Sequence, residues 1–311
     1  MSAGPPRHPH GEAWLAEARH AGALATGVVY PCSRDALAGA LEARDAGLID
    51  PLLIGPEATL RELADRASLS LADCRFIDVA EPVAAAREAA ALARDGAVAA
   101  LMKGSLHTDE LMGVVVSRDG GLRTARRISH VFAMDVPRHS RPLLVTDAAV
   151  NIHPNLAVKA DIVRNAVAVG HALGIAVPKV ALLSAVEMVN PALPATEDAR
   201  VLTEMAQRGE LGGAVIHGPL AFDNAISLEA ARIKGIDTPV AGEVDVLVVP
   251  GLEAGNILYK ALVYLADALA AGIVTGTRVP IILTSRADSA ASRKASAALA
   301  CLVARAAGRS L

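Results

Sequence analysis

Four short segments place hydroxyl, amide and basic side chains directly after apolar, strand-like runs. They are ALMKGSLHTDELM (100–112), VIHGPLAFDNAIS (215–227), VLVVPGLEAGNILYKAL (246–262) and IILTSRADSAAS (281–292). Glycine lets a ligand approach the backbone, a helix N-terminus offers unpaired N–H groups, and arginine suits phosphate or carboxylate. Together the segments predict an anion pocket, although each one alone is more typical of an ordinary capped strand-to-helix turn.

The candidate residues lie at or shortly after the end of a predicted strand: Lys103, Gly104, Ser105, Gly255, Asn256, Ser285 and Arg286. A fifth segment, GGLRTARRISHVF (120–132), adds Arg123, Arg126 and Arg127. If this segment is helical, Arg123 and Arg127 share a face. That face is either solvated or completes the anion pocket.

Strand and helix patterns alternate along most of the chain, which predicts an α/β fold with a mostly parallel sheet covered on both faces. The predicted strands are 26–31, 51–55, 75–80, 98–104, 130–137, 141–150, 178–185, 213–217, 244–250 and 279–284. The predicted helices are 33–47, 56–67, 81–96, 157–173, 197–208, 225–235, 255–271 and 288–307. A short polar turn separates 130–137 from 141–150, so we expect these two strands to pair antiparallel.

Composition excludes several classes of protein. The 311 residues are 53% hydrophobic but only 2% aromatic, and the net charge is −3. Without a basic stripe or stacking aromatics, we expect no nucleic-acid partner. The apolar stretch 261–275 is interrupted by Asp267 and is too short for a membrane span, so no membrane association is expected. The first residues predict a loose leader without a signal peptide, and a soluble, cytoplasmic protein.

No metal site is predicted. Cys32, Cys74 and Cys301 are scattered and are expected to be small buried hydrophobes. The histidines form no i,i+4 ligand pairs, and Asp147 and Asp161 lack a third partner. The sequence also has no dinucleotide-binding G-x-G-x-x-G, P-loop, nucleophile elbow or H-E-x-x-H motif.

The chain resembles the phosphate acetyltransferase and phosphate butyryltransferase family in six motifs that occur in order: LMKGSLHTDELM, SHVF, VTDAAVNIHPNL, IHGPLAFDNAIS, PGLEAGNILYKAL and LTSRADSAAS. The likeness runs from about residue 26 to the C-terminus and is strongest to the butyryltransferase-like branch. That branch includes the phosphotransacylase part of bifunctional proteins with an enoyl-CoA hydratase domain, for which the first 25 residues here are too short.

The resemblance implies a two-domain isocitrate/isopropylmalate dehydrogenase-like fold with its active cleft between the domains. Domain one would comprise 1–139 plus 277–311, and domain two 140–276. The resemblance also implies a homodimer and the reaction acyl-CoA + phosphate = acyl phosphate + CoA. The partners would then be these small substrates, and no cofactor would be permanently bound.

The resemblance also implies roles for several residues. Ser285 and Arg286 match the catalytic Ser-Arg pair of the family: Ser285 would donate to the oxyanion, and Arg286 would hold phosphate or balance the developing charge. Arg123 approximately matches a phosphate-binding arginine, a role that Arg126 or Arg127 could fill instead. Gly255 and Asn256 would help to shape the cleft.

One position departs from the acetyltransferase branch, which has an aspartate seven residues after the catalytic serine, thought to deprotonate CoA. Here that position is Ser292. The nearest carboxylate, Asp288, would either act as the base or cap the last helix. We expect direct transfer in a ternary complex, because Ser285 has no evident adjacent base that would make it a nucleophile.

Two alternatives to the transferase stay open. One is a metal- and nicotinamide-dependent dehydrogenase of the same architecture, and the other is a non-catalytic acyl-CoA-binding protein, which Ser292 would favour. Acetyl is the first choice of acyl group, but butyryl and other short chains fit as well. One methylene changes the binding free energy by only about 1–3 kcal/mol.

Overall fold

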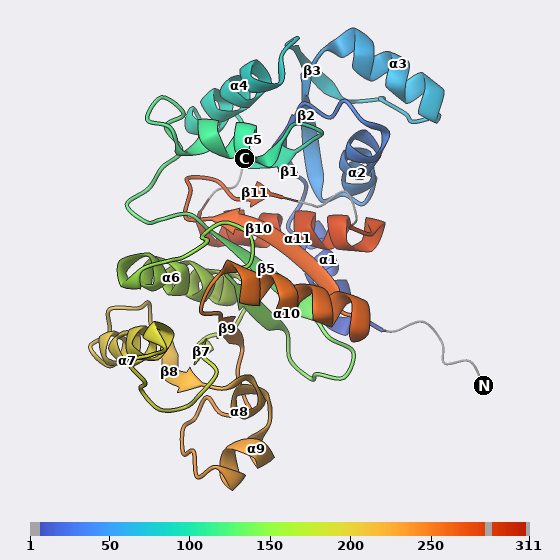
Figure 1. Ribbon diagram of the computed structural model, residues 1–311. Helices are drawn as coiled ribbons and strands as arrows, with labels where there is room; N and C mark the ends of the chain where they lie inside the picture. The colour runs from blue at the N-terminus through green and yellow to red at the C-terminus, as the bar shows by residue number, and fades with distance from the viewer. Residues whose placement is uncertain (1–6, 284–287, 309–311) are drawn as a thin grey trace, which may run out of the picture. The chain divides into compact units, whose positions relative to one another are not determined.

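The computed structural model describes residues 7–283 and 288–308, in which helices and strands alternate along the chain (Figure 1). The chain divides into two units by its internal contacts. The N/C unit comprises Gly11–Arg126 and Ala271–Leu311, and the middle unit comprises Met1–His10 and Arg127–Ala270. Within the described residues, no helix is long and apolar enough to cross a membrane.

The sheet of the N/C unit is parallel except at one strand. Its parallel strands lie in the order β3 (Arg75–Asp78), β2 (Ile49–Gly55), β1 (Leu24–Val29), β4 (Ala100–Lys103) and β11 (Ile281–Ile282). β10 (Leu269–Thr275) pairs antiparallel with β11. Because parallel strands end at the same edge, Tyr30, Lys103 and Leu283 leave the sheet at one edge, which we call the C-terminal edge.

Local sequence signals mark the ends of some helices of the N/C unit. The helices of this unit are α1 (Pro9–His20), α2 (Arg34–Asp45), α3 (Glu57–Ala67), α4 (Pro82–Arg94), α5 (Thr108–Val116) and α11 (Ala290–Ala306). Ser33 caps α2 by accepting the Ala36 N–H at 3.3 Å, and Gly47 follows its last turn with φ 71°. Pro82 opens α4, and the face that α4 buries consists of alanines, which allows a close approach to β1 and β2.

The middle unit carries the second part of the alternation. Its strands lie in the order β5 (Ser129–Asp135), β6 (Leu143–Thr146), β9 (Val246–Val248), β7 (Lys179–Leu183) and β8 (Val215–Leu220). Its helices are α6 (Leu156–Ala172), α7 (Pro194–Gln207), α8 (Phe222–Ile226), α9 (Leu228–Ile233) and α10 (Leu252–Leu265). β5 pairs antiparallel with β6, as predicted, and the other neighbours are parallel. The prediction of an α/β fold with a mostly parallel sheet is therefore confirmed.

Small aliphatic side chains fill the core of the middle unit, in agreement with the low aromatic content. One aromatic pair stands among them: the Phe132 ring stacks on the Tyr259 ring with centroids 3.9 Å apart and planes 7° from parallel. This contact attaches α10 to β5.

Three element predictions were wrong. Residues 9–20 form α1 rather than a loose leader, because Trp14 and Ala18, one turn apart, are both buried. The predicted helix 255–271 ends at Leu265, and β10 follows it. Its apolar run of alanine, leucine and isoleucine is compatible with a helix or with a strand, and pairing with β11 stabilises the strand. The predicted helix 225–235 is two short helices, and the Ser227 side chain caps the second by accepting the Ala230 N–H.

The unit boundaries lie away from the predicted domain boundaries. After a first passage at 10/11, the chain passes between the units at 126/127 and 270/271, whereas the sequence predicts boundaries at 139/140 and 276/277. The shift at the first boundary follows from the pairing of β5 with β6, which places residues 127–139 in the middle unit. The shift at the second follows from the pairing of β10 with β11, which places residues 271–276 in the N/C unit. In both divisions the last segment belongs with the early part of the chain.

Candidate functional site

A tight turn follows β4 at the C-terminal edge of the N/C unit. The Gly104 N–H donates to the Val29 carbonyl at 2.9 Å, and the Ser105 N–H donates to the Tyr30 carbonyl at 2.9 Å. The Ser105 hydroxyl donates to the same Tyr30 oxygen at 2.8 Å. These three hydrogen bonds hold residues 103–105, which we call the Lys103 turn, against the end of β1.

Only glycine fits at the centre of the Lys103 turn. A Cβ atom on Gly104 would lie 2.3 Å from the Val29 oxygen and 2.5 Å from the Tyr30 oxygen. The Lys103 ammonium donates to the Gly104 and Leu106 carbonyls, both at 3.1 Å, and thereby closes the turn. Burial is the main cause that raises the pKa of the Tyr30 phenol, so this neighbour is neutral at physiological pH. The turn therefore combines a positive charge with a rigid backbone, which suits an anionic ligand.

Ser285 and Arg286 lie outside the described residues. The nearest described strand is β11, where Ile282 lies beside Met102, the residue before Lys103. After the gap, Asp288 comes just before α11. The N-cap of this helix is Ser289, whose hydroxyl oxygen accepts the Ser292 N–H at 3.1 Å, so capping by Asp288 is not observed. The uncharged Ser289 hydroxyl is sufficient for this cap. The backbone carbonyl of Asp288 accepts a hydrogen bond from the Arg293 guanidinium at 2.8 Å.

Arg123 is not part of the Lys103 turn. It forms an antiparallel bridge with Thr277, and the Arg278 N–H donates to the Leu122 carbonyl at 2.9 Å. This places Arg123 at the N-terminal end of β11, opposite to the C-terminal edge where Lys103 lies. The segment is an extended loop, so the helical face that Arg123 would share with Arg127 does not exist.

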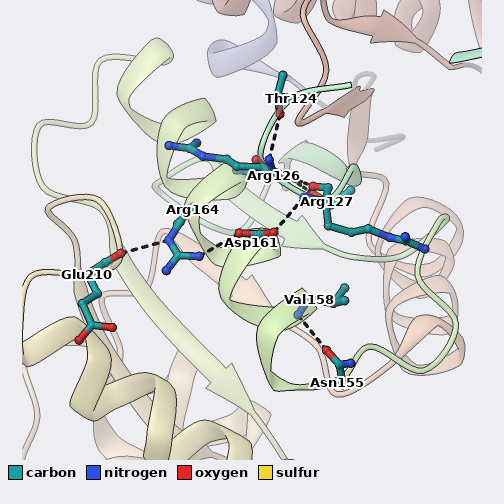
Figure 2. Close-up of polar contacts among 10 residues, drawn as sticks. Thr124, Arg126, Arg127, Asn155, Val158, Asp161, Arg164 and Glu210 are labelled. Carbon is teal, nitrogen blue, oxygen red and sulfur yellow. Dashed lines mark hydrogen bonds and ion pairs between the residues drawn. The ribbon is translucent and has the colours of Figure 1, made fainter. Parts of the chain in front are cut away.

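Arg126 and Arg127 make local contacts instead (Figure 2). The Arg126 N–H donates to the Thr124 hydroxyl at 3.1 Å in the N/C unit. In the middle unit, the Arg127 N–H donates to Asp161 Oδ2 at 2.9 Å, and Arg164 Nη1 donates to Asp161 Oδ1 at 2.8 Å. Asp161 is thus the partner of a backbone amide and a guanidinium.

Asp147 organises the turn after β6 in the middle unit. Its carboxylate accepts the Ala149 and Val150 N–H groups at 3.0 Å and the Asn151 amide at 2.6 Å. Asp147 is buried, and these donors satisfy its charge. Its role in the structure is that of a turn organiser.

Gly255 and Asn256 lie against the same turn. A Cβ atom on Gly255 would come within 3.0 Å of both Ala148 carbons, and the Asn256 amide donates to the Ala148 carbonyl at 3.3 Å. The structure thus places both residues beside the turn after β6 within the middle unit. What they would bind there stays a prediction.

His130 of the SHVF motif is fully buried beside Phe132, with ring centroids 4.2 Å apart. Burial lowers the pKa of His130 to about 4, against an opposing effect of the Asp147 charge. The imidazole is therefore neutral at physiological pH. Within residues 7–283 and 288–308, no group of three or more His, Cys, Asp or Glu side chains could hold a metal ion.

Comparison with known proteins identifies the family. The model of the family described as phosphate acetyl/butaryl transferase matches residues 79–301. The chain belongs to this family. The matched region includes the Lys103 turn, the Asp147 turn, the start of α10 and the Ser-Arg-x-Asp segment (285–288), so every candidate segment lies within it.

Curated phosphate acetyltransferases and phosphate butyryltransferases resemble the chain over most of its length. A phosphate acetyltransferase from Rhizobium meliloti is 54% identical over 93% of this chain and 92% of its own length. A phosphate butyryltransferase from Clostridium beijerinckii is 42% identical over 85% and 87%, respectively. The solved structure of a branched-chain phosphotransacylase from Enterococcus faecalis matches with a TM-score of 0.79 and 30% identity, over 90% of this chain and 99% of its own.

The sequence missed residues that come together only in the fold. The Tyr30 carbonyl anchors the Lys103 turn, although Tyr30 lies 73 residues earlier in the chain. Ser117, Arg118, Gly121, Arg123 and Arg278 line one hollow of the N/C unit with a volume of about 430 Å³, which we call the arginine hollow. Arg118 and Arg278 stand in no recognisable motif, so no sequence signal marks either residue.

Proposed function

We propose that this protein is a phosphate acyltransferase that converts acyl-CoA and phosphate into acyl phosphate and CoA. The observation that carries the proposal is the family match over residues 79–301, with identity of 54% to a phosphate acetyltransferase over 93% of the chain. The relatives that are 54% and 42% identical to the chain are named a phosphate acetyltransferase and a phosphate butyryltransferase, and the 30% identical solved structure is that of a phosphotransacylase. These observations favour the transferase over the dehydrogenase alternative.

In the direction from acyl phosphate, the CoA thiolate attacks the acyl carbonyl. The carbon–sulfur bond forms, a tetrahedral oxyanion collapses, and the carbon–oxygen bond to the phosphate breaks, releasing inorganic phosphate. Oxyanion and phosphate are adjacent negative charges, and each preorganised donor stabilises such a state by about 3 kcal/mol. We assign the donor role to Ser285 and the charge-balancing role to Arg286, on the family's Ser-Arg pattern.

We assign to the Lys103 turn the binding of an anionic part of the substrates, on the strength of its fixed ammonium and its tightly held backbone. Gly255 and Asn256 are proposed to shape the site from the middle unit. Asp288 is proposed as the base that deprotonates CoA, since Ser289 takes the capping role and Ser292 carries no carboxylate. The thiol of CoA has an ordinary pKa near 8.5, so a weak base suffices.

The acyl group is proposed to be acetyl first, because the 54% identical relative is named an acetyltransferase, with butyryl as the second choice from the 42% identical relative. The isocitrate dehydrogenase-like form of the fold, a homodimer and a cytoplasmic location stay predictions.

The proposal is tested by mixing the protein with acetyl-, propionyl- and butyryl-CoA and following free thiol with and without phosphate. We expect release that depends on phosphate, with the ranking of rates naming the acyl group. Arg286→Ala should lose most of the rate, whereas Arg66→Ala, which changes an exposed arginine on α3, should retain it. Release without phosphate would indicate a thioesterase, and CoA binding without any turnover would indicate a binding protein.

A further inference from the structure

Tyr30 combines a bulky side chain with a left-handed backbone. Its φ is 52°, and the other non-glycine residues with positive φ in the described ranges are the small polar Ser68, Asp73 and Asp267. Left-handed backbone is unfavourable for residues that carry a Cβ atom, and aspartate and asparagine tolerate it best because their side chains can hydrogen-bond locally. Pro31 follows Tyr30, and the residue before a proline favours extended backbone. The local sequence therefore opposes the conformation of Tyr30, so tertiary contacts must hold it.

The hydrogen bonds of Tyr30 show what this backbone achieves. In an extended strand, the N–H and C=O groups of one residue point toward the same neighbouring strand. The Tyr30 N–H donates to the Ile54 carbonyl of β2 at 2.7 Å, but the Tyr30 carbonyl accepts the N–H of Ser105, which follows β4, at 2.9 Å. The preceding carbonyl, of Val29, also faces the Lys103 turn, where it accepts the Gly104 N–H. The left-handed backbone thus directs two consecutive carbonyl groups to this turn.

The Lys103 turn lies at a point of the sheet where α/β proteins bind ligands. The chain runs from β1 to β2 and β3 on one side of β1, and then through α4 to β4 on the other side. The carboxyl ends of β1 and β4 therefore flank a topological switch point, outside which ligands bind in open parallel sheets. Val29 pairs with Lys103, so Tyr30 and Gly104 are the first residues beyond the two strand ends. Tyr30 therefore fixes the backbone that carries the Lys103 ammonium at this point.

The side chain of Tyr30 helps to hold the left-handed backbone. Glycine adopts this backbone at the least cost, but it also leaves the chain flexible. A Cβ atom built on Gly55 would lie 3.7 Å from Tyr30 Cδ2, so the ring lies against the end of β2. Burial is the main cause that raises the pKa of the phenol, so the ring keeps its proton at neutral pH. The ring therefore serves packing rather than proton transfer.

We propose that Tyr30 is a positioning residue of the acyltransferase: its left-handed backbone holds the Lys103 turn, and thereby the Lys103 ammonium, in place for the anionic part of the substrates. This inference rests on the proposed function of the turn. Tyr30 acts through Lys103 and does not need to touch the substrate. A residue at position 30 that favours extended backbone would rotate the carbonyl back toward β2 and release the Ser105 N–H and hydroxyl.

The test compares Tyr30→Val, Tyr30→Asn and Tyr30→Phe by thiol release from acetyl-CoA in the presence of phosphate. Valine is β-branched and disfavours the left-handed region strongly, whereas asparagine tolerates it and phenylalanine keeps the ring. Because a misplacement of about 1 Å can cost about 100-fold in rate, we expect kcat/KM to fall by about 10- to 100-fold in Tyr30→Val. The loss should be smaller in Tyr30→Asn and smallest in Tyr30→Phe. A residue that only packs would instead tolerate apolar valine better than polar asparagine.

Two controls isolate the action through Lys103. In a double-mutant cycle with Lys103→Ala, the loss caused by Tyr30→Val should largely disappear, because the group that Tyr30 positions is already absent. Ser68→Val places valine at another left-handed residue, exposed at the end of α3, so it should lower stability while kcat/KM stays as in the wild type. If Tyr30→Val does not fold, Tyr30→Ala takes its place, because alanine also disfavours positive φ. Full additivity in the cycle, or equal losses in the valine and asparagine variants, would overturn the assignment.

Amide hydrogen exchange, followed by NMR, tests the geometry without turnover. The Ser105 N–H should exchange faster in Tyr30→Val than in the wild type, and Tyr30→Asn should retain more of the protection. Equal protection of this amide in all three proteins refutes the inference even if the enzyme is active. If the wild type releases no thiol, the proposed function fails, and faster exchange in Tyr30→Val than in Tyr30→Asn still supports Tyr30 as the residue that holds the turn.

Discussion

Replacing Gly104 by alanine tests whether the Lys103 turn is as tightly constrained as its contacts indicate. The new Cβ atom would lie 2.3 Å from the Val29 oxygen, and side chains essentially never approach closer than 3.0 Å. The turn must therefore move away from β1 by at least about 0.7 Å. The clash is between backbone atoms, so no flexible side chain can relieve it by changing its rotamer.

The retreat weakens three hydrogen bonds at 2.8–2.9 Å, from the Gly104 N–H, the Ser105 N–H and the Ser105 hydroxyl. Each contributes about 0.5–1.5 kcal/mol, so we expect the free energy of unfolding of the N/C unit to fall by about 2–4 kcal/mol. If the turn positions substrate, as proposed, a displacement approaching 1 Å should also lower the phosphate-dependent rate by about 10- to 100-fold.

Urea unfolding followed by circular dichroism, together with thiol-release rates, measures both effects. Gly55→Ala is the matched control, because it also ends a strand at the C-terminal edge and faces Tyr30. There the new Cβ atom would meet the Tyr30 Cα at 3.6 Å and Leu60 Cδ1 at 3.7 Å, which are ordinary contacts. We expect this control to change the free energy of unfolding by no more than about 0.5 kcal/mol. If Gly104→Ala changes the free energy of unfolding and the thiol-release rate no more than Gly55→Ala does, the argument from close contact is refuted.

Three further predictions concern buried groups. Burial lowers the pKa of His130 to about 4 from an ordinary 6.5. Between these pH values the unfolded chain therefore binds more protons than the folded chain. The free energy of unfolding should fall by roughly 3 kcal/mol as the pH drops from 6.5 to 4. Unfolding measured across this range should show a smaller loss of stability in His130→Gln than in the wild type; an equal loss in both would contradict the assignment. The buried Lys159 ammonium pairs with Asp198 at 2.8 Å, so Asp198→Ala should destabilise the protein by about 3 kcal/mol, more than the double variant Lys159→Met/Asp198→Ala, in chemical denaturation. The Cys301 thiol donates to the Leu48 carbonyl at 2.9 Å and burial raises its pKa to about 12, so a thiol reagent should label it only after unfolding; rapid labelling of the native protein would show that the site is open.

The local sequence determined the elements whose signals are self-contained. Ser33 and Gly47 mark the ends of α2, and Pro82 the start of α4, because caps and proline act through the neighbouring backbone alone. The family also follows from the sequence, since ordered motifs survive in the chain whatever their distance in space. The alternation of strand and helix patterns along the chain also predicts the mostly parallel α/β organisation of both units.

Local signals failed where two states were equally favourable. Residues 269–275 suit a helix or a strand, and the partner strand β11 chose between them. The pattern around Trp14 is too short to distinguish a helix from a leader, and burial of one face decided it. The capping role fell to Ser289 rather than Asp288 because geometry at the helix start, not charge, selects the cap.

The sequence by itself thus predicted candidate residues for the chemistry: the lysine, glycine and serine at the end of β4, the glycine and asparagine at the start of α10, and the Ser-Arg-x-Asp segment (285–288). Only the tertiary structure decided which of them lie together. It joined Ser105 of the Lys103 turn to the distant Tyr30 carbonyl, separated Arg123 from that turn, and gathered Arg118 and Arg278 beside Arg123 in the arginine hollow. The physical reason is that strand pairing brings together residues far apart in the chain, and spacing along the sequence carries no record of which strands will be neighbours.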